Sequence, residues 1–197
     1  MLKYAVKAVD KLIWNEIEKA PIDKFVWLRE YCPISYGQLA FVEGEGLHVR
    51  LTCFESSPKA VYSDFYSSVY KDSCLEFFAA FGESGKYINC EMNSAGASLI
   101  GIGTERHGRH RIDEFIEVPK ITASHTADSW SVEVVFTQDD IEKLFGTRIR
   151  VGTVFKGNLY KCGDETEIEH YGMWNPVESA KPDFHRPESF GTFEIKK

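Results

Sequence analysis

Alternation of apolar and polar residues is the feature that most constrains the fold of this chain. Leu47, Val49, Leu51 and Cys53 are separated by polar residues, and the same two-residue period recurs at 87–93 and 131–134. A period of two is typical of a half-buried β-strand. Further strands are predicted at Lys3–Val9, Lys24–Glu30, Gln38–Val42, Cys74–Phe81, Ser98–Ile102, Glu114–Val118, Thr122–Ala127, Ile149–Lys156, Glu167–Tyr171 and Gly191–Ile195.

Helical signals are few. Thr137 suits an N-cap, acidic residues follow it, and Gly146 suits the residue after the last turn, so a helix is predicted over 138–145. A weaker helical turn is expected near Leu12–Glu16. Many short strands with one or two short helices favour an all-β fold, an antiparallel β-sandwich or jelly roll. With no linker or internal repeat, residues 1–197 are predicted to form a single domain.

Composition narrows the classes of partner. The net charge is −7, which argues against nucleic acid, because a phosphate backbone needs a basic surface. No apolar run reaches the ~20 residues of a membrane span. No signal peptide is visible, so a cytoplasmic location is expected unless an export signal has been removed. The five cysteines are scattered and form no CxxC pair, so no metal site is predicted. Nothing in the sequence indicates an oligomeric state.

Two predicted strands carry candidate binding residues. Glu76 shares a strand face with Cys74 and Phe78, and a carboxylate in apolar surroundings needs a partner or a ligand. The next strand places a polar row, Tyr87, Asn89, Glu91 and Asn93, on one face. If the two strands pair, Glu76 and this row line one concave surface suited to hydroxyl groups. The alternative is a solvated sheet face, as on many antiparallel sheets.

The last quarter of the chain is rich in aromatic residues, proline and glycine, over 170–177 and 182–191. Proline and glycine exclude a regular helix there, so a rigid loop is predicted. Such a loop could present Trp174 to a flat, partly polar ligand such as a sugar ring. The competing interpretation is that Trp174 anchors the core.

Several segments resemble carbohydrate-binding module family 9, in order from about Trp27 to Phe193. They are Tyr70-Lys-Asp-Ser-Cys-Leu-Glu-Phe-Phe78, Tyr87-Ile-Asn-Cys-Glu-Met-Asn93 followed by Gly96, Trp130-Ser-Val-Glu-Val-Val-Phe136, Trp174-Asn-Pro176 and Pro182-Asp-Phe-His-Arg-Pro-Glu-Ser-Phe-Gly191. The segments 70–78 and 182–191 are the specific ones. The resemblance implies a β-sandwich that clamps a mono- or oligosaccharide between two aromatic rings.

By their positions in the matching segments, the resemblance implies that Tyr70 and Trp174 are the two aromatic rings. It gives Glu76 and Asn93 as hydrogen-bonding groups at the rim. Glu91 falls where better-known members can carry a basic residue, and Asn158 adds a further contact in this interpretation. No cofactor is predicted. Structural calcium occurs in some relatives, although no loop here has calcium-ligand spacing.

Two other functions remain open beside non-catalytic sugar binding, for which no catalytic residue is assigned. One is a glycoside hydrolase that uses Glu76 and Glu91 as its carboxyl pair, although no catalytic motif supports it. The other is a haem-binding relative of the same sandwich, with Met92 or Met173 and His170 as axial ligands.

Two features near these segments have no assigned binding role. The basic island Arg106–Arg111 is interpreted as a solvated loop, and the alternative is a site that binds a carboxylate or phosphate. His185 is expected to shape its loop through a hydrogen bond to backbone, with contact to the ligand as the alternative.

Overall fold

The computed structural model describes residues 1–197. Its strands in the first half are β1 (Lys3–Val9), β2 (Ala20–Pro21), β3 (Ser35–Val42), β4 (Gly46–Cys53), β5 (Cys74–Ala80), β6 (Tyr87–Asn93) and β7 (Ser98–Gly103). Those that follow are β8 (His110–Arg111), β9 (Thr122–His125), β10 (Trp130–Thr137), β11 (Val154–Gly163), β12 (His170–Met173) and β13 (Gly191–Lys196). The single α-helix, α1, is Gln138–Phe145, and 3-10 turns lie at Trp14–Glu16, Val69–Lys71, Ile112–Glu114 and Pro187–Ser189.

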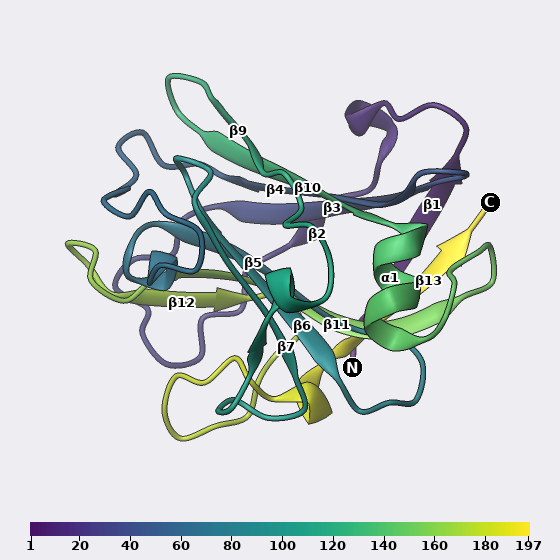
Figure 1. Cartoon of the computed structure of the whole chain (residues 1–197). Helices are drawn as coiled ribbons and strands as arrows, with labels where there is room; N and C mark the ends of the chain where they lie inside the picture. The colour runs from purple at the N-terminus through teal and green to yellow at the C-terminus, as the bar shows by residue number, and fades with distance from the viewer.

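The strands form one curled sheet in the order β8-β7-β6-β5-β11-β13-β1-β3-β4-β10-β9, with β12 beside β11 and β2 beside β3. Figure 1 shows the curl as two layers, with β3, β4, β9 and β10 above β5, β6, β7, β11 and β12. The expected all-β sandwich is confirmed. The pairing of β1 differs from the expected antiparallel arrangement, because β1 runs parallel to both of its neighbours, β13 and β3. No helix is long and apolar enough to cross a bilayer.

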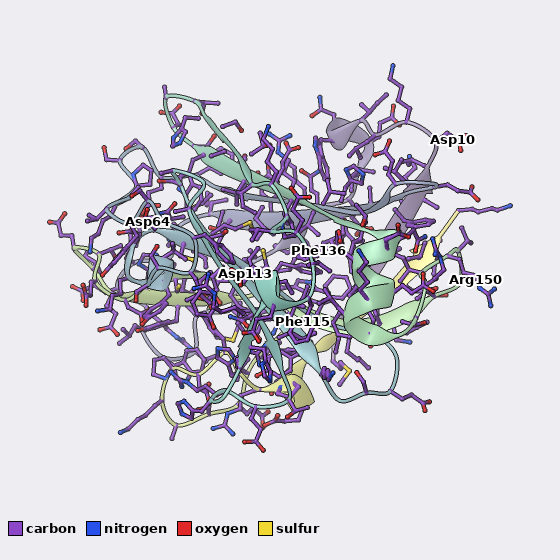
Figure 2. The ribbon with its side chains drawn as sticks, viewed as in Figure 1. Asp10, Asp64, Asp113, Phe115, Phe136 and Arg150 are labelled. Atoms are coloured by element: carbon purple, nitrogen blue, oxygen red, sulfur yellow. The ribbon has the colours of Figure 1, made fainter.

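The main core lies between the layers. The apolar residues that alternate along β4, among them Leu47, Val49 and Leu51, meet Leu75 and Phe77 of β5 there. Phe136, labelled near the middle of the molecule in Figure 2, belongs to this core and lies 6.2 Å from Phe77, ring centre to ring centre. The alternation of apolar and polar residues therefore predicted the main core correctly.

A second apolar cluster covers the opposite face of the lower layer. It contains Cys74 and Phe78 of β5, Tyr87 of β6, Tyr160 and Cys162 of β11, Tyr171 and Met173 of β12, and Val69, Ala97, Val177, Phe184 and Phe190 from connecting segments. Strand β5 is thus buried on both faces. The alternative of a solvated sheet face is wrong for this part of the molecule.

The predicted helix is confirmed over its full length. Thr137 Oγ1 accepts the backbone N–H of Asp140, and Asp140 Oδ2 accepts that of Thr137. Gly146 ends the helix with φ of 69°, a left-handed conformation that glycine adopts without strain.

Two strand predictions are wrong and two are misplaced, one of them Glu167–Tyr171, where β12 begins at His170 and ends at Met173. Residues 24–30 form a loop whose rings anchor it, since Phe25 packs on Gly172 and the Trp27 indole N–H donates to Ser179 O at 2.7 Å. Residues 114–118 follow a 3-10 turn and contain no strand. Strand β11 begins at Val154 rather than Ile149 and continues to Gly163, because the buried polar residues Asn158 and Lys161 conceal the apolar pattern of its second half.

The expectation that Trp174 projects from a loop toward a ligand is wrong. Its backbone N–H donates to Leu159 O at 2.9 Å, which continues the pairing of β12 with β11 and turns the indole to the main core. The side chain is only 3% exposed and lies 4.8 Å from the ring of Phe193. A Cβ on Gly191 would overlap the indole, so glycine at that position makes room for it. Trp174 is a core anchor.

Truncating Trp174 should therefore damage stability. We expect Trp174→Ala to lower the free energy of unfolding by about 3–5 kcal/mol, because it leaves a large cavity between Tyr4 and Phe193. Urea unfolding measures this change. Phe54→Ala, at a ring that is 46% exposed, is the matched control and should cost about 1 kcal/mol or less. A Trp174→Ala protein as stable as the control would contradict the assignment.

Candidate functional site

A pocket of about 460 Å³ opens on the outer face of the lower layer, away from the main core. Its floor comes from β5, β6, β11 and the residues just after β11, and contains Glu76, Asn89, Glu91, Cys162 and Asp164. Its less polar wall contains Tyr66, Tyr70, Leu99, Tyr171, Pro182 and Phe184. Its rim contains Arg106, His107, Gly108, Arg109, Asp183 and His185. The volume falls within the roughly 300–1,000 Å³ of small-molecule sites.

Glu76 and Glu91 lie directly opposite each other on the antiparallel pair β5 and β6. Their side chains are buried, at 3% and 5% exposed. Burial raises the pKa of Glu91 to about 7 and holds the pKa of Glu76 well above its usual range. Asp164, at the same pocket, has a pKa raised to about 6, also by burial. The floor therefore offers carboxyl groups that donate as well as accept hydrogen bonds near neutral pH.

Asn89 connects the floor to the basic segment. Its side-chain amide donates to Glu91 Oε1 at 2.9 Å, and its Oδ1 accepts from Arg109 Nε at 2.7 Å. The Arg109 guanidinium also donates to Tyr87 O at 2.7 Å and lies over the Tyr87 ring, 4.1 Å from its centre. The basic island is therefore not simply a solvated loop. Arg109 holds the end of β6, and the orientation of Glu91 depends on it through Asn89.

A second connection joins the basic segment to the C-terminal segment that carries Phe184 and His185. Arg106 donates to Asp183 Oδ1 at 3.1 Å, and Arg186 contacts Asp183 Oδ2 at 2.8 Å. His185 Nδ1 lies 3.0 Å from the Tyr87 hydroxyl, so its partner is a side chain rather than the expected backbone group. These contacts hold the two rim segments across the pocket mouth.

The segment between β4 and β5 supplies Tyr66 and Tyr70. Tyr66 is the one non-glycine residue with positive φ, 65°, which is unusual for an aromatic residue and common at binding sites. Buried Asp72 fixes this segment, because its Oδ2 accepts the backbone N–H groups of Val61 and Tyr62 at 2.9 and 3.0 Å. Asn93 adds a third bond to the same oxygen at 2.9 Å.

The predicted site residues divide into two groups. Tyr70, Glu76 and Glu91 line the pocket, whereas Asn93, Asn158 and Trp174 do not. Asn93 is fully buried, and its Oδ1 accepts the backbone N–H groups of Ala95 and Ala97 at 3.2 and 3.0 Å. Asn158 is also fully buried and bonds to the backbone of Asn175 in both directions. Asn93 stabilises the turn after β6, and Asn158 joins β11 to the segment after β12, so neither is a rim group of this pocket.

Sequence reasoning missed several pocket residues. Asn89 belonged to the polar row but received no role of its own. Tyr171 and Phe184 had the right signal, aromatic side chains in the C-terminal segment, but Trp174 was preferred to them. Tyr66 and Asp164 carry no local signal. Arg109 belonged to the basic island, but its role depends on contacts with β6 that the sequence does not show.

The haem hypothesis does not fit the structure. Met92 is fully buried in the main core, and Met173 Sδ accepts the backbone N–H of Val177 at 3.1 Å. Both ring nitrogens of His170 are engaged, with Lys161 Nζ at 2.7 Å and Ile168 O at 2.8 Å. None of these groups is available as an axial ligand.

His185 gives the site a dependence on pH that unfolding measurements can detect. Burial first, and the nearby charges of Arg109 and Arg106 second, lower the pKa of His185 from 6.5 to about 3. As the pH falls, the His185 imidazole is therefore protonated in the unfolded chain while it stays neutral in the folded chain. The stabilisation from His185 is lost as the pH falls below about 6.5.

We expect His185→Gln to make the free energy of unfolding less dependent on pH below about pH 6.5. The difference in unfolding free energy between wild type and variant should shrink by up to ~1.4 kcal/mol per pH unit below that point. Urea unfolding at several pH values measures it, and His107→Gln, an exposed histidine of the same rim, is the control. Parallel curves for wild type and His185→Gln would contradict the buried neutral state.

Comparisons with known proteins agree with this architecture. A Bacteroides uniformis ATCC 8492 protein, provisionally described as carbohydrate-binding, superposes with a TM-score of 0.83 and 26% identity over 98% of this chain and 99% of that one. A family 9 carbohydrate-binding module from Caldicellulosiruptor kristjanssonii, solved with cellotriose and with glucose, gives a TM-score of 0.70 in both cases at 12% identity. Those alignments cover 99% of this chain and 94% and 96% of the two solved chains.

The comparison with curated proteins finds no match. The comparison with family models matches carbohydrate-binding family 9 over residues 7–195. Because this match takes in nearly the whole sequence, the chain belongs to carbohydrate-binding family 9.

Proposed function

We propose that the pocket above β5 and β6 binds a sugar, a glucose unit or a short oligosaccharide, without hydrolysing it. Family membership and the solved family 9 module with cellotriose and glucose support carbohydrate binding. The observation that carries the proposal for this pocket is its composition. Buried hydrogen-bonding groups form its floor, and three tyrosines, Tyr66, Tyr70 and Tyr171, stand in its wall.

The wall suits the apolar face of a pyranose. A tyrosine ring offers a large rigid surface and loses little side-chain entropy on binding. Tyr70 is held on the 3-10 turn Val69–Lys71, and its backbone O accepts the N–H of Asp164 at 3.1 Å. Tyr70 is partly exposed, whereas Tyr171 is 8% exposed. Tyr70 therefore keeps accessible ring surface for a ligand.

The floor suits the hydroxyl groups. Glu76 accepts one hydrogen bond, from the Cys162 thiol at 2.9 Å, and Glu91 accepts one, from Asn89. Each carboxyl group therefore retains hydrogen-bonding capacity that a ligand could use. A hydrogen bond to such a group contributes roughly 1–3 kcal/mol to binding, because leaving it unpaired in a buried site is costly.

The paired carboxyl groups also raise the second candidate function, glycoside hydrolysis. A retaining hydrolase needs two carboxyl groups about 5–5.5 Å apart, and one of them must be ionised to act as nucleophile. Residues opposite on antiparallel strands have Cβ atoms at about that separation. Burial, however, raises the pKa of both Glu76 and Glu91. Neutral carboxyl groups suit hydroxyl recognition better than nucleophilic attack, so binding is favoured.

Calorimetric titration with cellotriose tests the proposal. Tyr70→Ala should weaken binding roughly fivefold, the equivalent of about 1 kcal/mol of ring stacking. Glu91→Gln, which keeps the shape and removes the carboxyl group, should weaken it roughly tenfold or more. Tyr36→Ala in the other layer and Glu83→Gln on an exposed turn are the matched controls and should bind as wild type does.

A chromogenic glucoside assay on the same proteins separates the two functions. We expect no turnover from the wild-type chain. Turnover that disappears in Glu91→Gln would establish the hydrolase instead. Equal affinity of all variants for cellotriose would place the sugar site elsewhere.

A further inference from the structure

Two thiols and a carboxyl group meet beside the floor of the pocket, which Glu76 and Cys162 line and the fully buried Cys74 does not. Cys74 and Glu76 are two residues apart on β5, so their side chains share its outer face. Cys162 lies directly opposite Cys74 on the antiparallel neighbour β11. The two Sγ atoms and a carboxylate oxygen of Glu76 lie within 4.8 Å of one another. The register of two strands thus creates this cluster.

No cationic side chain forms a hydrogen bond or an ion pair with the three side chains of the cluster. The carboxyl group of Glu76 accepts its one hydrogen bond from Cys162, at 2.9 Å. The neighbouring cation in sequence, Lys161, alternates to the opposite face of β11, where it contacts His170. Arg109 is occupied by Asn89 and the backbone of Tyr87. Three groups that become anions on losing a proton are buried together, and their other contacts are long ones from the thiols to the backbone oxygens of Tyr70 and Leu75, at 3.6 and 3.8 Å.

We propose that Cys74, Glu76 and Cys162 bind a thiophilic divalent cation of the zinc type. Thiolate sulfur and carboxylate oxygen are ligands of zinc, with bonds of about 2.3 Å and 2.0–2.2 Å. Such bonds bring tetrahedral ligand atoms to within about 4 Å of one another, close to the separation observed here. Calcium does not suit these donors, because it takes oxygen ligands.

The fourth coordination position faces the pocket. Glu76 and Cys162 both line it, so a cation held there has one side open to water or to a ligand. Three protein ligands with an open position differ from a closed four-ligand structural site. The metal site stands on this donor set alone and does not depend on the proposed sugar function.

Cobalt(II) is the probe for this site, because its thiolate complexes absorb strongly and its tetrahedral complexes are coloured. Titration of the reduced full-length chain with Co²⁺ should give one equivalent with thiolate-to-cobalt charge-transfer bands, and Zn²⁺ should displace it. The bands should disappear in Cys162→Ser. They should persist in Cys32→Ser, the matched control at the exposed cysteine outside the cluster.

Two further measurements keep the test decisive if Cys162→Ser fails to fold. Glu76→Gln removes one ligand with little change of shape and should weaken Co²⁺ binding tenfold or more. X-ray absorption of the zinc-loaded wild type should show two sulfur ligands at about 2.3 Å together with lighter atoms. Failure of sugar binding with an intact cobalt spectrum would refute the sugar proposal alone.

Three results would overturn the metal site. The first is the absence of thiolate-to-cobalt bands from the reduced wild type. The second is bands that survive Cys162→Ser in a folded protein. The third is a zinc spectrum without sulfur ligands. Thiol counting before each titration confirms that Cys74 and Cys162 are reduced.

Discussion

Burial of both faces of strand β5 is the constraint on which the rest of the structure depends. Leu75 and Phe77 belong to the core between the layers, and Cys74 and Phe78 belong to the cluster on the other side. A surface strand would leave the second face to water. Here the connecting segments must cover it, and Glu76, which lies between Cys74 and Phe78, is enclosed with them. The pocket is the part of this covered face that the segments do not fill.

Polar contacts between distant segments determine the shape of that pocket. Asp72 and Asn93 hold the segment that carries Tyr66 and Tyr70. On the other side of the pocket, Arg109 joins the basic island to β6 through Asn89. Each contact joins a connecting segment to the end or the face of a strand. The walls are therefore positioned by hydrogen bonds to a rigid sheet. This arrangement suits a binding site whose geometry exists before its ligand arrives.

Local pattern was enough to predict most of the strands, the helix and the side of β5 on which Glu76 lies, because these signals depend on neighbouring residues alone. It was not enough for Trp174. That indole faces the core because β12 pairs with β11 in a register that places Trp174 beside Leu159, fifteen positions earlier in the sequence. The basic island was interpreted as a solvated loop for a similar reason, since Asn89, the partner of Arg109, lies on another element. Tyr70, which the family resemblance gave, and Glu76 and Glu91, which the strand alternation gave, line the pocket.

The account rests on the pocket of Tyr70, Glu76 and Glu91 as the ligand site, with Trp174 as part of the core. Backbone amide chemical shifts recorded during titration with glucose or cellotriose test it most directly. The account predicts that the largest changes fall on β5, β6 and the segments carrying Tyr70, Arg109 and His185. Changes centred on the opposite layer, around β3 and β4, or no change at saturating sugar, would contradict it.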